Sequence, residues 1–298
     1  MHRRLIINAD DFGYAEGSVP AIIALYEAGV VTSTTALVNQ RHWPEAATYL
    51  RDHPGLGAGV HLVMNDGCPI LPPEQVISLV DAEGRFRDGP QLLRRYGRLR
   101  TGELKAEWRA QIAKFIADAG RQPDHLDLHC YYPYAFPHWF RISLELAQEY
   151  GHLPVRMPFD DALDRKAPEM AADNGFPTWY VRWQGRRYQR MVERYGLKRP
   201  DYFEMSFSQE DHRTTDYLLS LLDTLPDGLT ELLAHPGTEG WREKDYCALH
   251  DPKVKQRIEE LGVELVDYRA LMGTFASSLP SNEQTELLGD LKPKPEVN

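Results

Sequence analysis

Short apolar runs alternate with longer amphipathic segments along most of the chain. Residues 5–7 (LII) form the first run, residues 16–29 carry apolar side chains at helical spacing and end at a glycine, and residues 32–39 (TSTTALVN) are rich in β-branched side chains. A strand, a helix and another strand in this order predict a β-α-β unit with parallel strands. Similar patterns predict further strands at 57–64, 125–130, 153–157 and 230–235, and helices at 42–53, 103–119, 139–150 and 216–225, with residues 254–272 closing the fold.

The length and the regular alternation predict one α/β domain. A chain of 298 residues is within the range of a single α/β barrel, so we expect one domain over residues 1–276 rather than two. Residues 65–100 lose their periodicity and predict a loop over the face where the strands end. Residues 158–208 become aromatic and arginine-rich, which indicates an insertion beside that face. Residues 277–298 have few large apolar side chains and three prolines, so we expect a disordered or loosely docked tail.

Charge and cysteine content argue against several classes of partner. The formal net charge is -10 and no block is dense in Lys or Arg, which argues against a nucleic-acid or anionic-membrane partner; only residues 182–190 stay open as a local basic groove. The three cysteines, Cys68, Cys130 and Cys247, form no CxxC pair and suit a reducing compartment. The apolar run near Met1 is too short for a signal peptide and no segment could span a bilayer, so we expect a cytoplasmic protein with a small-molecule substrate.

Polar side chains stand at the carboxyl ends of the predicted strands. Two adjacent carboxylates, Asp10 and Asp11, follow the first apolar run. The other strand ends carry Asn39, His61, Asp127, His129 and His235. Because the carboxyl ends of parallel strands converge in a barrel, we expect these side chains to lie together where α/β enzymes carry out their chemistry.

A divalent metal ion would suit this cluster. One carboxylate and two neutral imidazoles, with open positions for water, form a ligand set typical of zinc or another first-row ion, and Asp11, His61 and His129 supply it. Taken singly, each histidine is better explained as a hydrogen-bonded residue near the surface, and the two carboxylates could simply cap the next helix. The joint pattern, with polar groups at the ends of several different strands, favours the metal.

Alternation along a strand assigns separate roles to neighbouring residues. Successive side chains point to opposite faces, so Asp10 and Asp11 are expected to project to opposite sides, one towards the metal and the other sideways. His125, Asp127 and His129 are spaced by two and are expected to share one face. Only His129 would reach the metal. His125 would lie lower in the barrel, and Asp127 would orient an imidazole or shape the pocket.

Five motifs occur in a fixed order along the chain: NADDFG at 8–13, TSTTALVN at 32–39, GVHLV at 59–63, HLDLH at 125–129 and AHPG at 234–237. Together they resemble the YdjC-like family of chitooligosaccharide and carbohydrate deacetylases, over residues 1 to about 273. The resemblance implies a (β/α) barrel, distorted or incomplete, related to polysaccharide deacetylases. It also implies one divalent ion, with magnesium and zinc both open, and hydrolysis of an N-acetyl group on an amino sugar. By the same resemblance, Asp11, His61 and His129 match the metal ligands, Asp10 the catalytic base and His235 a catalytic-site histidine.

One segment departs from the family pattern. Where family members commonly carry a histidine-dense run of the form DSHHHVHMFP, residues 127–137 read DLHCYYPYAFP. His129 is kept and the later histidines are replaced, so the departure bears on the substrate more than on the metal. Tyr131, Tyr132 and Tyr134 offer stacking faces for a sugar instead.

These assignments predict metal-assisted hydrolysis of an amide. Asp10 would remove the proton from the attacking water and His235 would protonate the leaving amine, although an orienting hydrogen bond from His235 to Asp10 is an alternative. A hydrolase of phosphate esters would be expected to gather Arg and Lys at the strand ends, where only Arg156 is available. A non-catalytic sugar-binding protein would not need a base beside a metal ligand.

Side chains predicted to contact the substrate are Asn39, Tyr131, Arg156 and Trp183. The resemblance implies an acetylated sugar or glycolipid as substrate, and sugar rings can stack on aromatic side chains such as Trp183. Trp183 and its aromatic neighbours could equally belong to the core or to a subunit interface, so a homodimer also stays open.

Overall fold

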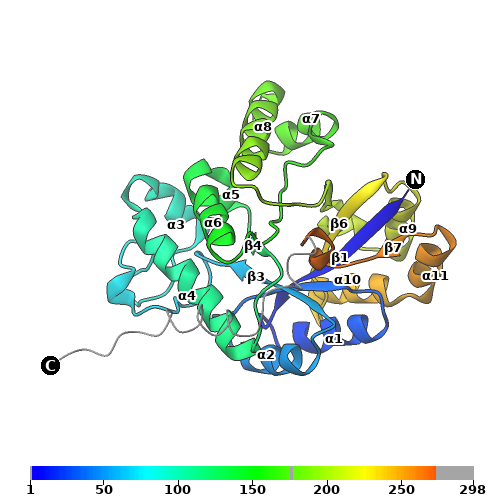
Figure 1. The fold of residues 1–298 in the computed structure, drawn as a ribbon, viewed down its shortest axis with the longest axis horizontal. Coiled ribbons are helices and arrows are strands. Elements are labelled where there is room, and N and C mark those ends of the chain that lie inside the picture. The colour runs from blue at the N-terminus through cyan, green and yellow to red at the C-terminus, as the bar shows by residue number, and fades with distance from the viewer. Residues whose placement is uncertain (1, 175–176, 273–298) are drawn as a thin grey trace.

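Seven parallel strands form one curled sheet at the centre of the molecule (Figure 1). The computed structural model describes residues 2–174 and 177–272, and within them the strands follow the order β4-β3-β2-β1-β6-β5, with β7 also paired to β1. The strands are β1 (Arg3–Phe12), β2 (Ser33–Ala36), β3 (Gly57–Leu62), β4 (Leu126–Leu128), β5 (Tyr202–Glu204), β6 (Gly228–Ala234) and β7 (Glu264–Leu265). Since every pair is parallel, all the carboxyl ends open on the same face.

The sheet curls into a barrel that is left incomplete between β4 and β5. Beyond β4, Val155 forms a single parallel bridge with Leu126, and its N–H donates to the carbonyl of Lys198 at 2.9 Å. The open edge of β5 is occupied by side chains, because the Asp160 carboxylate accepts the Phe203 N–H at 2.9 Å. The prediction of a single-domain α/β barrel, distorted or incomplete, is therefore confirmed.

Helices cover the outside of the curled sheet (Figure 1). The longer ones are α1 (Ser18–Glu27), α2 (Trp43–Asp52), α4 (Thr101–Ala119), α6 (Pro137–Glu149), α9 (Thr215–Asp223), α10 (Gly240–His250) and α11 (Pro252–Glu260). Two short helices, α3 (Gly89–Arg94) and α5 (Tyr132–Ala135), lie in the segments that follow β3 and β4. A pair, α7 (Leu163–Asn174) and α8 (Thr178–Arg194), packs together at the top of the view. Among the described residues, none of these helices combines the length and apolarity needed to cross a membrane.

The two faces of β1 have different partners. Leu5, Ile7 and Ala9 belong to the large apolar core shared with the surrounding helices. Ile6 faces the inside of the barrel, where Leu229 and Tyr268 form a small separate cluster with it. Above that cluster the interior is polar, so the barrel has an apolar outer layer and a charged centre.

Most predicted elements appear close to their expected positions. The strands predicted at 5–7, 32–39, 57–64, 125–130 and 230–235 are confirmed as β1, β2, β3, β4 and β6. The strand predicted at 153–157 is wrong, because only the bridge at Val155 forms. Strand β5 was not predicted, although it lies within the expected insertion at 158–208. The bounds of that insertion stay a prediction, and the tail predicted at 277–298 lies outside the described residues.

Close packing inside the barrel makes Gly59 sensitive to substitution. A Cβ atom at this position would lie 2.5 Å from Nε2 of His125, whose ring stacks on Tyr268 at 3.8 Å and binds Asp124 through Nδ1 at 2.6 Å. Because that ring is held on two sides, Gly59→Ala is expected to lower the free energy of unfolding by about 1–3 kcal/mol, as overpacking typically does. Urea denaturation measures the effect.

The matched control is Gly102→Ala in α4, where an added Cβ meets nothing within 4 Å. Alanine favours a helix over glycine, so this variant should be at least as stable as the parent protein. Equal stability of Gly59→Ala and the parent protein would contradict the packing argument.

Candidate metal centre and active site

A backbone irregularity brings the two adjacent carboxylates to the same place. The pairing of β1 with β2 shifts register between Ala9 and Phe12, and Asp11 adopts a left-handed conformation with φ of 68°. Aspartate tolerates this conformation better than most residues. As a result, Asp10 Oδ2 lies 3.8 Å and Asp11 Oδ1 lies 3.7 Å from Nε2 of His61. The prediction that Asp10 and Asp11 project to opposite sides is wrong, because the bulge interrupts the alternation.

The three predicted metal ligands meet at one point. Asp11 Oδ1 lies 3.7 Å from His61 Nε2 and 3.4 Å from His129 Nδ1, and all three ligand atoms lie within 4.8 Å of one another. Asp11 Oδ1 and His129 Nδ1 are buried without a hydrogen-bond partner. Unpaired buried polar atoms are costly, and two of them beside a third ligand atom, His61 Nε2, fit a bound cation. The donor set therefore fits a divalent metal ion.

Asp127 fixes the orientation of one of these imidazoles. His61 on β3 and Asp127 on β4 are direct register partners, and His61 Nδ1 lies 2.8 Å from Asp127 Oδ1. Burial opposes ionisation of Asp127, but Arg156 and His61 outweigh it and lower the pKa of this carboxyl well below its ordinary value. An ionised Asp127 accepts the Nδ1 proton, which leaves the Nε2 lone pair of His61 facing the cluster. This is the orienting role predicted for Asp127.

Asp11 and His129 stabilise opposite charges on each other. Burial opposes the charged form of Asp11, but the adjacent imidazoles of His129, His235 and His61 hold its pKa well below the ordinary value. Burial also opposes a charged His129, but the Asp11 carboxylate and Cys130 raise its pKa well above the ordinary value. A positive charge is therefore favoured at this point, and a divalent ion would take the place of the His129 proton.

Arg156 holds Asp10 from inside the barrel. Its Nη1 donates to Asp10 Oδ2 at 2.6 Å and its Nη2 to Asp10 Oδ1 at 2.7 Å. The same guanidinium also contacts Asp127 Oδ2 at 2.8 Å and donates through Nε to Glu231 Oε1 at 2.7 Å. Because all three nitrogens face carboxylates and the side chain is only 4% exposed, this placement does not fit the substrate contact predicted for Arg156. It fits a residue that positions Asp10.

The sequence reasoning missed Arg242 and Trp241 at the start of α10. Arg242 Nη2 donates to Asp11 Oδ2 at 2.5 Å, and its guanidinium lies 5.2 Å from the Tyr14 ring and 4.5 Å from the Trp241 ring. Arg242 thus occupies the Asp11 oxygen that faces away from the two histidines. No strand-end pattern marks either residue, because they reach the site from a helix after the AHPG turn.

His235 follows the carboxyl end of β6, as predicted. Its backbone N–H donates to Asp245 Oδ2 at 2.8 Å, and its ring lies 5.7 Å from that of Trp241. The ring Nδ1 is buried without a partner. Burial lowers the pKa of His235, although the charges of Asp11 and Asp10 act in the other direction. The neutral imidazole is therefore favoured at neutral pH.

The other residues predicted to bind substrate are not brought into the cluster. Asn39 donates through Nδ2 to the carbonyls of Asp66 at 2.9 Å and Cys68 at 3.0 Å, which ties down the loop after β3. Tyr131 is exposed, and Trp183 is exposed on α8. Across residues 2–174 and 177–272, no hydrogen bond, ion pair or ring contact links Asn39, Tyr131 or Trp183 to the metal ligands. Their contact with substrate stays a prediction.

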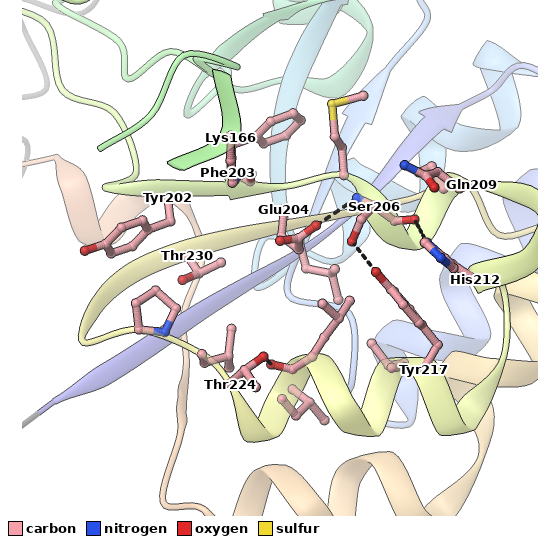
Figure 2. A pocket seen from close by; sticks show the side chains of 18 of the residues that line it. Lys166, Tyr202, Phe203, Glu204, Ser206, Gln209, His212, Tyr217, Thr224 and Thr230 are labelled. Atoms are coloured by element: carbon pink, nitrogen blue, oxygen red, sulfur yellow. Dashed lines mark hydrogen bonds between the residues drawn. The ribbon is translucent and has the colours of Figure 1, made fainter. Parts of the chain in front are cut away.

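A separate hollow of about 480 Å³ lies between β5, β6 and α9. Figure 2 shows Ser206 in contact with three residues that line this hollow. Its N–H donates to Glu204, its carbonyl lies beside the His212 ring and its hydroxyl accepts from Tyr217. None of the metal-cluster residues lines it. The hollow is therefore distinct from the candidate metal centre.

Comparisons with known proteins agree with this architecture. The model of the family described as YdjC-like protein matches residues 4–260. A carbohydrate deacetylase of Geobacillus stearothermophilus is 32% identical over 282 residues, which are 90% of this chain and 98% of that protein. A chitooligosaccharide deacetylase of Yersinia enterocolitica is 29% identical over 283 residues, 90% of this chain and 99% of that protein.

A solved structure supports the same relationship. The crystal structure of a candidate cellobiose-phosphate cleavage protein from Enterococcus faecalis V583 superposes with a TM-score of 0.73 at 32% identity, covering 91% of this chain and 99% of that chain. The similarity thus extends over the sheet, the helices and the candidate site together. On these matches in sequence and structure, the chain belongs to the YdjC-like family.

Proposed function

We propose that this protein hydrolyses an N-acetyl group from an amino sugar or glycoconjugate in a metal-dependent reaction. The observation that carries the proposal is the cluster itself, in which a buried carboxylate, Asp10, stands 3.8 Å from an imidazole of a three-residue ligand set. A base beside an open metal site is the arrangement that amide hydrolysis requires. The relatives that are named as carbohydrate and chitooligosaccharide deacetylases favour an acetylated sugar as substrate.

Asp11, His61 and His129 would hold the ion. When bound, it would supply a Lewis acid for the acetyl carbonyl and lower the pKa of nearby water. Two imidazole nitrogens with one carboxylate favour zinc or another first-row ion over magnesium, which prefers oxygen ligands. Arg242 would keep the Asp11 carboxylate in the orientation that presents Oδ1 to the ion.

Asp10 would accept the proton of the attacking water. Arg156 donates to both of its oxygens, which fixes the orientation of the carboxylate at the edge of the cluster. His235 would return a proton to the leaving amine. Since burial favours its neutral form, His235 would first have to take up the proton that Asp10 removes from the water, and would then give it to the amine nitrogen as the C–N bond breaks.

We also propose that Asn39, Tyr131 and Trp183 contact the substrate, and that the protein works in the cytoplasm. The three cysteines are free and exposed, which supports a reducing compartment. A homodimer stays a proposal, for which the exposed Trp179 and Trp183 of α8 offer a surface.

Acetate release from a panel of substrates tests the proposed function. The chelator-treated protein, reloaded with zinc or magnesium in turn, is incubated with N-acetylglucosamine, its short oligomers and an N-acetylated glycolipid. We expect acetate only from the metal-loaded protein, with one substrate class clearly preferred. Failure to release acetate from every substrate with either metal would overturn the proposal.

A further inference from the structure

Four arginines line one hollow beside α3. Figure 1 shows this short helix at the left of the view. The arginines are Arg87, Arg94, Arg95 and Arg98, and the hollow that they share with Asp81 and Glu83 has a volume of about 660 Å³. The first precedes α3, and the others lie at its end and in the 3₁₀ turn Tyr96–Arg98. None of the metal-cluster residues lines this hollow.

These four guanidinium groups lack partners within the protein. Across residues 2–174 and 177–272, no ion pair or side-chain hydrogen bond involves any of them, and Arg87 Nε is buried without a partner. Arginines elsewhere do find carboxylates, as Arg199 does with Asp161 and Arg257 with Asp223. Exposed arginines such as Arg41 and Arg85 also lack a carboxylate partner among the described residues, and what distinguishes these four is that they line the same hollow.

The nearby carboxylates do not neutralise the hollow. Asp81 Oδ1 accepts the backbone N–H groups of Glu83 at 3.0 Å and Arg85 at 2.9 Å, so this oxygen holds the turn together. Four arginines and two acidic residues leave a formal charge of +2 in the lining. This excess matches the charge of a phosphate group, about -1.5 to -2 at neutral pH.

The frame around the hollow is well fixed. Asp88 caps α3 by accepting the Gln91 N–H at 2.8 Å, and the Phe86 N–H donates to the Gly67 carbonyl at 3.0 Å. Leu92, two residues before Arg94 in α3, is fully buried. The backbone that carries the guanidinium groups is thus held in place, although their ends are free to close on a ligand.

We infer that this hollow binds a phosphate-type dianion. The planar guanidinium group donates two parallel hydrogen bonds to a phosphate, so several arginines that line one hollow are suited to hold such an anion. Free phosphate and a phosphate group carried on a sugar share this chemistry. The site lies on the segment that follows β3, the strand that ends beside His61, so an anion here would rest on a loop of the active-site face.

Equilibrium dialysis with labelled inorganic phosphate tests the inference. The full-length protein is stripped of metal with a chelator and kept at constant ionic strength with chloride, so that neither the metal centre nor general screening contributes. We expect saturable binding that weakens by at least about tenfold in Arg94→Gln/Arg95→Gln/Arg98→Gln, because each charged hydrogen bond lost costs roughly a factor of ten or more.

The matched control removes three exposed arginines from α8, as Arg187→Gln/Arg190→Gln/Arg194→Gln. It changes the net charge equally and should bind phosphate like the parent protein. Absence of saturable binding, or equal weakening in both triple variants, would overturn the inference. The deacetylase proposal is untouched by either result, since the metal-free protein is used throughout.

Competition identifies the source of the phosphate group. If glucosamine 6-phosphate displaces the label more effectively than inorganic phosphate does, and glucosamine does not displace it, the ligand is a phosphorylated sugar. Displacement no better than that by inorganic phosphate indicates the free ion. A label displaced equally by glucosamine would contradict recognition of phosphate.

Discussion

Replacing His61 or His129 with alanine is expected to reduce bound metal from about one divalent ion per chain to almost none. Each imidazole supplies one of three ligand atoms that lie within 4.8 Å of one another, so losing either leaves an ion with two protein ligands. The affinity should fall by more than the roughly 10–100-fold that accompanies loss of a hydrogen-bond partner of a ligand. Elemental analysis after dialysis against metal-free buffer measures the occupancy.

His212→Ala is the control for this experiment. Its imidazole stacks on Tyr217 at 3.9 Å beside the separate hollow near α9, so the variant loses a histidine without touching the cluster. Metal content should then match that of the parent protein. Full occupancy in both His61→Ala and His129→Ala, with folding verified by circular dichroism, would show that the ligand assignment is wrong.

The sequence was sufficient to predict most of the elements and the point where Asp11, His61 and His129 come together. Apolar runs and amphipathic periods mark β1, β2, β3, β4 and β6, because these strands are buried and bounded by turn residues. The proximity of His61 and His129 could be predicted because parallel strands converge at their carboxyl ends, and no detail of the loops is needed for that argument. Strand β5 is as short as β4, but only its middle residue is buried, so no apolar run marks it in the sequence.

Contacts between distant elements explain what could not be predicted. Arg156 and Asp10 are 146 positions apart in the sequence. The residues that flank Arg156 do not reveal whether its side chain pairs with a carboxylate inside the barrel or faces the substrate. Arg242 reaches Asp11 across 231 positions and from a helix rather than a strand. The pairing of these charges depends on how the barrel closes, which a pattern of apolar residues does not specify.

Backbone conformation explains the remaining error. Alternation predicts opposite directions for Asp10 and Asp11, but that rule holds only while the backbone stays extended. The left-handed conformation at Asp11 breaks it and places both carboxylates next to His61. The two residues therefore differ in their partners, Arg156 for Asp10 and Arg242 for Asp11, rather than in the face of the strand on which they lie.

Asp10→Asn is expected to lower kcat by about 100-fold or more while leaving the metal in place, since general-base catalysis typically contributes 10²–10⁴-fold. Asparagine keeps the shape of the side chain, and its oxygen can still accept from Arg156. The fold should survive, because Arg156 retains its contacts with Asp127 and Glu231. Removing one buried negative charge also reduces the repulsion among the carboxylates that surround Arg156. What is lost is the ability to take a proton from water. Acetate release and metal content, measured on the same preparation, separate the two effects.

Asp11→Asn should fail in a different way. The amide is a weaker metal ligand than the carboxylate, and Arg242 loses the charged partner that it contacts at 2.5 Å. Excess metal should therefore restore part of the activity of Asp11→Asn but none of the activity of Asp10→Asn. If metal-loaded Asp10→Asn released acetate at nearly the parental rate, Asp10 could not be the base. The role would then pass to His235, a partly buried imidazole whose Nδ1 has no hydrogen-bond partner and whose neutral form can accept a proton.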